Sequence, residues 1–170
     1  ISCDSNGKEA VFIFKTFSEP HLGEMSYFKV YSGTLKSGDE LYNHETRSSE
    51  RFTQFFLLNG KNKEASEELR AGDIGVVVKL KGSKINDTLS EKGNEIAVKP
   101  IDFPDAQVHF SVMPPNKADL EKIAMGLHQL EKEDPTVIVE QSQELRQTLI
   151  HGQGEMHLQV VKYRVEKLYN

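Results

Sequence analysis

The sequence contains no tryptophan and a single cysteine, Cys3, among its 170 residues. One cysteine cannot form a disulfide within the chain, so we expect a protein of a reducing compartment, the cytoplasm. Long apolar runs are also missing. A stretch such as Ile74–Val78 is far shorter than the ~20 residues that cross a bilayer, so no membrane partner is expected. The phosphate-binding pattern Gly-x-x-x-x-Gly-Lys-Ser/Thr does not occur.

Positive charge is in the minority, with a formal net charge of −5. This balance argues against a protein that coats nucleic acid along its whole surface, but it allows local basic patches. Lysines gather in the stretches "NGKNK" and "KLKGSK", the latter carrying Lys79, Lys81 and Lys84. The chain has 37% hydrophobic and 28% charged residues, which is typical of a globular protein.

Residues 1–104 predict a domain made of strands alone. Runs such as "AVFIFKTF", "MSYFKVYSG", "RFTQFFLL", "AGDIGVVVKL", "DTLS" and "EIAVKPI" are short, rich in β-branched and aromatic residues, and separated by turn signals such as Ser37-Gly38-Asp39. No amphipathic helix is indicated among them. Strands at this spacing favour a small closed β-barrel, which also removes exposed sheet edges.

Residues 105–170 predict a second domain of the order strand, helix, strand, strand, helix. "VHFSVMP" alternates as a half-buried strand does, and "TVIVEQS" and "LRQTLIHG" indicate two more strands. Apolar residues recur at helical spacing from Leu120 to Leu130 and again after Glu155, with Asn116 expected as the first N-cap and Asp134-Pro135 as the stop. This order is a split β-α-β unit of the ferredoxin-like α+β type that lacks its last strand.

The stretch "HGQGEMHL" (residues 151–158) has three readings. A zinc site would use His151 and His157, but no third ligand is evident. A nucleotide loop would use Gly152 and Gly154, but the third glycine of the dinucleotide fingerprint is missing. The favoured interpretation is a sharp strand-to-helix turn with Glu155 at the helix N-terminus. We therefore expect neither a metal nor a cofactor at this stretch. We also expect no catalytic residues in the chain.

The stretches "YFKVYSGTLKSGDELYN", "AGDIGVVVKLK", "EKEDPTVIV" and "QTLIHGQGEMHL" resemble elongation factor G, a ribosomal translocation GTPase, over nearly the whole chain. The resemblance implies that residues 1–104 are the family's second domain, a translation-factor β-barrel, and residues 105–170 its third. It also implies that a GTPase domain, which binds GTP and Mg²⁺, and a fourth and fifth domain belong to the whole protein. The implied partners are the ribosome, through small-subunit RNA and a small-subunit protein, and the other domains of the same chain.

Departures from the family pattern favour an elongation-factor-G-like paralogue, while elongation factor G itself stays open. Gly-Met-Gly-Glu-Leu-His-Leu is usual where this chain has Gly152-Gln-Gly-Glu-Met-His-Leu, and Gly-Asp-Thr-Leu is usual at residues 86–89. Alternatives are a tetracycline-resistance-type ribosomal protection protein and a ribosome-recycling or otherwise specialised paralogue. A stand-alone interaction module and an enzyme acting through the histidines rank lower.

By residue match, the resemblance implies that His157, Val161 and Arg164 line the junction between domains. It further suggests that Asp134, at the end of the first helix, pairs with Arg164. Contacts to ribosomal RNA are expected at basic residues of the barrel: Arg51, Lys61, Lys63 and Lys79.

Asn116-Lys117-Ala118-Asp119 matches the Asn-Lys-x-Asp pattern by which GTPases recognise guanine. Because the chain has no phosphate loop, these residues are interpreted as a helix start, and no guanine-nucleotide binding is expected.

Overall fold

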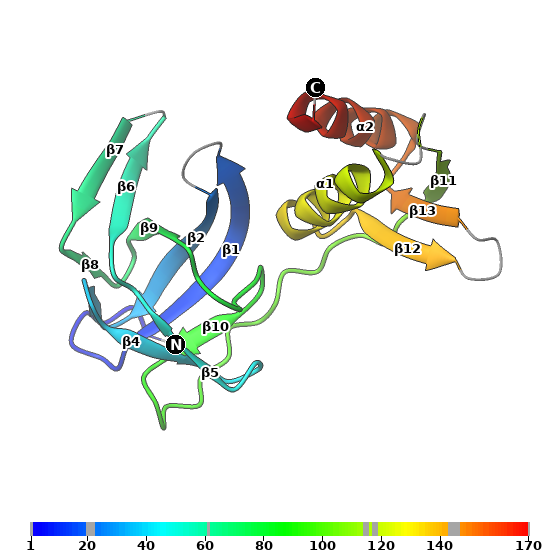
Figure 1. Ribbon diagram of the computed structural model, residues 1–170. Helices are drawn as coiled ribbons and strands as arrows, with labels where there is room; N and C mark the ends of the chain where they lie inside the picture. Colours follow the sequence, from blue (N-terminus) through cyan, green and yellow to red (C-terminus); the bar gives the residue numbers. More distant parts are fainter. Residues whose placement is uncertain are drawn as a thin grey trace. The chain divides into compact units, whose positions relative to one another are not determined.

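The computed structural model divides the chain into two compact units, Ile1–Ile101 (unit 1) and Asp102–Asn170 (unit 2). Unit 2 begins within the segment 102–107, where the pattern of the sequence changes. The structure describes residues 2–19, 23–60, 62–113, 116, 119–142 and 147–169. Figure 1 shows the elements of each unit.

Unit 1 is built from strands, and none of its described residues is helical. Its strands are β1 (Ala10–Glu19), β2 (Gly23–Ser32), β3 (Thr34–Lys36), β4 (Glu40–Asn43), β5 (Ser48–Arg51), β6 (Phe55–Asn59), β7 (Asn62–Ser66), β8 (Glu68–Arg70), β9 (Ile74–Val78) and β10 (Thr88–Ser90). Within the described residues they form an eight-stranded sheet in the order β5-β4-β10-β1-β2-β9-β6-β7 and a two-stranded sheet of β3 and β8. The prediction of a barrel-type all-β domain is confirmed.

Alternate residues of these strands form most of the core of unit 1. The ring centroid of Phe28 in this core lies 5.2 Å from that of Phe52 and 6.4 Å from that of Phe55. The buried cluster consists of Val11, Ile13, Phe28, Val30, Leu35, Leu41, Phe52, Phe55, Leu69, Val77 and Leu89. Burying each large apolar side chain contributes ~1.5–3 kcal/mol, so this cluster is the main source of stability in the unit.

The turn predicted at residues 37–39 is present, but it does not join two paired strands. Gly38 has a φ of 99°, a conformation that favours glycine, and the Asp39 amide donates to the Lys36 carbonyl at 3.1 Å. The flanking strands pair elsewhere: β3 with β8, and β4 with β5 and β10. The turn is therefore a corner between two sheets.

The prediction of a strand at "EIAVKPI" is wrong. Residues 95–101 form no strand, and side chains of the barrel hold them instead. The Val98 amide donates to Thr88 Oγ1 at 3.0 Å, and the Ile101 amide donates to Asn86 Oδ1 at 2.8 Å. A segment whose amides bond to side chains does not extend a sheet, whatever its β-propensity.

Unit 2 has the expected order of elements. They are β11 (Val108–Val112), α1 (Leu120–Glu133), β12 (Ile138–Ser142), β13 (Gln147–Gly152) and α2 (Glu155–Tyr169). The strands form an antiparallel sheet in the order β11-β13-β12. Both helices lie on one face of this sheet (Figure 1), and no fourth strand occurs among the residues described. The prediction of a ferredoxin-like unit is confirmed.

The helices of unit 2 bury most of the residues that carry the helical spacing, whereas Leu120 at the start of α1 is 50% exposed. The core cluster consists of Leu127, Leu130, Val137, Ile150, Leu158, Val161 and Val165. The expected N-cap of α1 is wrong, because the helix begins after Asp119, while the Asn116 side chain donates to Asp119 Oδ2 at 3.3 Å. The predicted stop is confirmed, since Asp134 has extended backbone angles. No helix in the described part of the chain is long and apolar enough to span a membrane.

Candidate functional site

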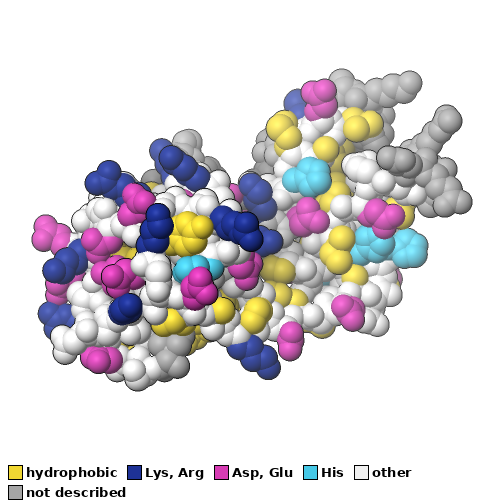
Figure 2. Space-filling view, turned by 90° about the horizontal axis from the view of Figure 1, so that it is seen from below, with side chains coloured by type: hydrophobic (Ala, Val, Ile, Leu, Met, Phe, Trp, Pro, Cys, Tyr) yellow, Lys and Arg dark blue, Asp and Glu magenta, His cyan; other side chains and the backbone are white. Residues whose placement is uncertain are grey.

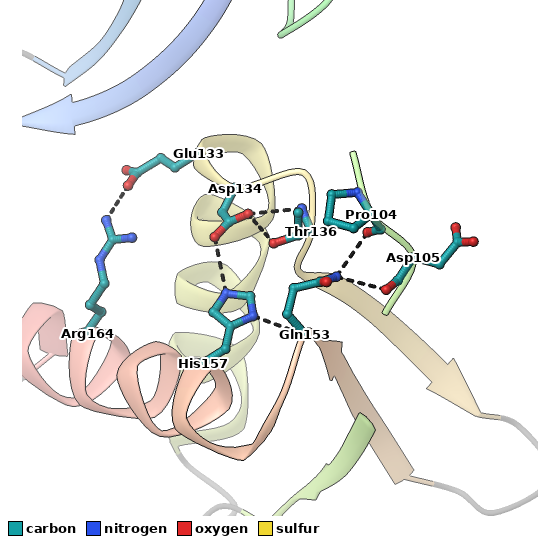
Figure 3. A network of polar contacts seen from close by, with 8 residues as sticks. All are labelled: Pro104, Asp105, Glu133, Asp134, Thr136, Gln153, His157 and Arg164. Carbon is teal, nitrogen blue, oxygen red and sulfur yellow. Dashed lines mark hydrogen bonds and ion pairs between the residues drawn. The ribbon is translucent and has the colours of Figure 1, made fainter. Parts of the chain in front are cut away.

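The entrance of α2 is a tight strand-to-helix turn, shown in Figure 3. A Cβ atom at Gly152 would lie 2.7 Å from Leu158 Cδ2 and 2.9 Å from His157 Nδ1, so a larger residue would force these two side chains of α2 to shift. Gly154 has no such neighbour within 4 Å. The first glycine is therefore required by close packing rather than by a ligand.

His157 joins this turn to the end of α1. Its Nδ1 accepts a hydrogen bond from the backbone amide of Gln153 at 3.1 Å, and its Nε2 lies 3.2 Å from Asp134 Oδ2. An accepting Nδ1 assigns the hydrogen of the neutral ring to Nε2, which then donates to the carboxylate. The imidazole thus connects the start of one helix to the end of the other.

Asp134 is an ionised acceptor at this junction. Burial by itself would raise the pKa of its carboxyl group. Hydrogen bonds from the hydroxyl and amide of Thr136, at 2.6 and 3.0 Å, and the bond with His157 outweigh burial and hold the pKa below its ordinary value. Three donors therefore fix the carboxylate in its charged form.

The predicted pair between Asp134 and Arg164 is wrong. Arg164 donates instead to Glu133, one residue earlier, in an ion pair between the helices. The Glu133 side chain is only 6% exposed and the Arg164 side chain 37% exposed. Neighbouring residues near a helix end point in different directions, so Glu133 faces Arg164 while Asp134 faces His157 (Figure 3).

Val161 belongs to the interior of unit 2. It is 4% exposed and lies in the cluster that contains Leu127 and Leu158. His157 and Arg164 therefore both contact residues at the end of α1, whereas Val161 packs in the core of unit 2. The role of these residues at a junction between domains stays a prediction.

Gln153 adds a contact that sequence reasoning missed. Its Nε2 donates to the carbonyls of Pro104 and Asp105, at 3.0 Å each, and so attaches the first residues of unit 2 to the entrance of α2 (Figure 3). Glutamine stands here where methionine is usual in the family, and this departure was the sequence signal that could have indicated the contact.

The other histidine of the "HGQGEMHL" stretch lies in a separate network. His151 on β13 places Nε2 3.0 Å from Glu140 Oε2, and its ring centroid is 5.6 Å from that of His109 on β11. His157 bonds to Asp134 and Gln153 instead. The two histidines therefore do not converge on a shared ligand position.

A cationic loop, residues 79–84, is the most distinctive charged feature of unit 1. Lys79, Lys81 and Lys84 are exposed, and none of them forms an ion pair with any residue that the structure describes. The buried Glu50 carboxylate holds the loop from beneath, because it accepts the amides of Lys81 at 2.9 Å and Gly82 at 2.7 Å. The Glu50 carboxylate therefore bonds to backbone amides of the loop, and the lysine ammonium groups face solvent.

Buried polar side chains tie the cationic loop to the turn between β4 and β5. The Asn43 amide group donates to Asp87 Oδ2 at 2.7 Å and to Ser83 Oγ at 3.3 Å. Asn43 Oδ1 accepts the backbone amides of Glu45 and Thr46 in the turn. The two segments are therefore rigidly connected, since a buried hydrogen-bond network is costly to break.

Backbone strain occurs in each of these two segments and again two residues after the cationic loop. Among the described residues, the non-glycine positions with positive φ are Arg47 at 55°, Lys79 at 63° and Asn86 at 79°. A left-handed conformation costs a non-glycine residue ~1 kcal/mol, with asparagine more tolerant. Strain of this kind clusters at functional sites, so the cationic loop and its neighbouring turn form the candidate site of unit 1.

The four expected RNA contacts have different surroundings. Lys79 lies in the cationic loop. Lys63 forms an ion pair with Glu19, so its charge is already neutralised, and Arg51 donates from Nε to the Gly38 carbonyl at 3.2 Å. Lys61 lies outside the described residues. Lys81 and Lys84, which were not among the four, have the more suitable surroundings. Figure 2 shows lysine and arginine side chains on the visible surface of this unit, with aspartate and glutamate side chains among them.

The fold is thus an all-β barrel-type unit followed along the chain by a ferredoxin-like α+β unit. The sequence profile "Elongation factor G domain 2" matches residues 8–92, and the profile "Elongation Factor G, domain III" matches residues 103–170. The chain belongs to the elongation factor G family and comprises domains II and III of its architecture.

A solved structure supports this assignment. A crystal structure of a protein from Thermus thermophilus is similar with a TM-score of 0.80 and 28% sequence identity. The match covers 94% of this chain and 24% of that protein, so the chain spans about a quarter of its relative's length.

Proposed function

We propose that this chain is the ribosome-docking part of a translational GTPase of the elongation factor G type, acting in the cytoplasm. Membership of the family supports this function. Hydrolysis of GTP, with its Mg²⁺ ion, belongs to a GTPase domain of the whole protein. The two units described here contact small-subunit RNA and a small-subunit protein and transmit the nucleotide state to the other domains, without bond-breaking chemistry of their own.

The observation that carries the proposal is the cationic loop. Ribosomal RNA presents phosphates at its surface, and lysine ammonium groups that have no acidic partner bind them without sequence preference. The loop is held in one conformation by Glu50, Asn43 and Asp87 before any RNA arrives. Preorganisation of this kind reduces the ordering cost of binding.

The helix junction of unit 2 supports the transmitting role. His157, Asp134, Glu133 and Arg164 couple the two helices through one hydrogen bond and one ion pair. Helices connected in this way move as one body, so a force applied to α2 by a neighbouring domain reaches α1. We expect the small-subunit protein to contact this unit.

The test compares two triple variants that remove the same number of positive charges. K79Q/K81Q/K84Q removes the lysines of the cationic loop. K8Q/K92Q/K99Q removes three exposed lysines elsewhere in unit 1, none of which has an ion pair among the described residues. Affinity for purified small ribosomal subunits is measured by co-sedimentation at fixed salt.

Loss of three phosphate contacts weakens binding about tenfold or more, because each contact contributes an increment of electrostatic free energy. We therefore expect this loss for the loop variant and little change for the control. Equal losses in the two variants would show that only net charge matters and would refute the docking role of the loop.

A further inference from the structure

The outer face of strands β1 and β2 is unusually aromatic for the exterior of a barrel. Val11, Ile13, Phe28 and Val30 point into the core. The alternation of β2 therefore places Tyr27, Lys29 and Tyr31 on the opposite face, where each is partly exposed. Phe14 and Lys15 join them from β1, at a shift in strand register between Ile13 and Lys15. These five residues, Phe14, Lys15, Tyr27, Lys29 and Tyr31, are called the tyrosine face below.

A lysine ammonium group lies over the ring of each tyrosine on this face. Lys15 Nζ lies 5.2 Å from the ring centroid of Tyr27, and Lys29 Nζ lies 5.5 Å from that of Tyr31. Both distances fall within the range of cation–π attraction. The rings are supported at their edges by phenylalanines, Phe14 at 6.4 Å from Tyr27 and Phe12 at 6.2 Å from Tyr31. Each ammonium group thus lies over its ring when no ligand is bound, so a base that stacks on that side of the ring must displace the ammonium group toward a phosphate.

The charge of the tyrosine face calls for an anionic partner. Neither Lys15 nor Lys29 pairs with a carboxylate among the residues in the described ranges. An aromatic surface with two uncompensated cations suits a ligand that offers flat, polarisable groups and regular negative charges. Nucleotides combine these two features, and base stacking on aromatic side chains tolerates any sequence.

The spacing of the rings selects the form of nucleic acid. Tyr27 and Tyr31 are four residues apart on one strand, which separates their backbones by about 13 Å. Stacked bases of a duplex lie ~3.4 Å apart and hide their faces from a protein. Only an unpaired strand with splayed bases can place one base on each ring.

We propose that the tyrosine face binds unpaired RNA, with bases stacked on Tyr27 and Tyr31 and phosphates at Lys15 and Lys29. The inference rests on the proposed function, because a ribosome-docking factor meets RNA as its partner. It adds a second site, distinct in position and chemistry from the cationic loop: the loop binds phosphates of any RNA, whereas the tyrosine face requires exposed bases.

The test uses the 170-residue chain and two fluorescein-labelled RNAs, a single-stranded uridine decamer and a hairpin duplex of similar charge. Binding is followed by fluorescence anisotropy. Tyr27→Leu/Tyr31→Leu removes both rings and keeps apolar bulk. Tyr27→Phe/Tyr31→Phe keeps both rings and serves as the matched control. A thermal melt of each variant shows that the fold persists.

We expect the decamer to bind more tightly than the duplex. The leucine variant should lose about tenfold or more in affinity for the decamer, because each stacked base contributes strongly, while the phenylalanine variant stays within about twofold. Lys15→Gln/Lys29→Gln should reduce the slope of log affinity against log salt by about 1. A leucine variant that binds the decamer like the parent chain overturns the inference, as does a duplex bound as tightly as the decamer. Self-association through this face without RNA binding would overturn it as well.

The proposals for the cationic loop and for the tyrosine face can be refuted independently of each other. If K79Q/K81Q/K84Q loses ribosome affinity while the leucine variant binds the decamer normally, the docking function stands and the tyrosine face is refuted. If the leucine variant loses the decamer while the loop variant keeps its ribosome affinity, the tyrosine face stands and the role of the loop is refuted.

Discussion

At the scale of single residues, Glu9 is the group whose ionisation most affects unit 1. Its pKa is raised from 4.5 to about 7, first because burial disfavours the charged form and then because Asp39 and Glu91 repel it. The folded state therefore binds more protons at Glu9 than the unfolded state between about pH 4.5 and 7. The free energy of unfolding must fall as the pH rises through that window.

Glu9→Gln should remove this pH dependence. The neutral amide avoids the repulsion, so the variant is expected to exceed the parent chain in stability at pH 8 by ~1 kcal/mol, a value reduced for solvent screening of a partly exposed group. Urea unfolding at pH 5 and pH 8 measures the effect. Glu95→Gln, at an exposed position, is the control. A variant whose stability falls with pH as steeply as that of the parent would remove Glu9 as the cause.

Arg164 tests the helix junction at the same scale. Because it pairs with Glu133 and not with Asp134, a double-mutant cycle of Arg164→Ala with Glu133→Ala should give a coupling energy of ~1 kcal/mol, and a cycle with Asp134→Ala a value near zero. Thermal unfolding supplies the four stabilities of each cycle. Coupling to Asp134 instead would contradict the contacts in the structure.

At the scale of elements, the turn from β13 into α2 depends on one glycine. Gly152→Ala places a methyl group 2.7 Å from Leu158 and should destabilise unit 2 by roughly 2 kcal/mol, the range of overpacking in a tight site. Gly154→Ala, with open space around it, should change stability by less than ~0.5 kcal/mol. Equilibrium unfolding of both variants decides the point, and equal effects would show that the glycines serve only backbone freedom.

The elements show what a sequence pattern can and cannot predict. Helical spacing located α1 and α2, and their ends agree with Asp134 and Glu155, because this information is local. The pairing of β3 with β8 joins residues more than thirty positions apart, and no local pattern contains it. "EIAVKPI" has the propensity of a strand, but the Thr88 and Asn86 side chains compete for its amides.

The candidate sites were predictable to a similar extent. The basic stretch "KLKGSK" is visible in the sequence, whereas the neutralisation of Lys63 by Glu19 and the support of the loop by Glu50 are long-range contacts. At the end of α1, Glu133 and Asp134 are adjacent acids, and only the rotation of the helix decides which one meets Arg164. Spacing alone cannot fix that rotation to within one residue.

At the scale of the whole molecule, a chain with a net charge of −5 is proposed to bind a polyanion. The two facts are compatible because acidic side chains elsewhere would repel RNA from most of the surface and leave the cationic loop and the tyrosine face as the proposed points of attachment. Docking should then depend on a few particular lysines rather than on the overall charge.

The salt dependence of binding to small ribosomal subunits tests this claim most directly. The slope of log affinity against log salt counts the phosphates that the chain neutralises, at about 0.7 for each contact with unpaired RNA. The account predicts that K79Q/K81Q/K84Q lowers the magnitude of this slope by about 2, while K8Q/K92Q/K99Q leaves it unchanged. Identical slopes for the two variants would contradict it.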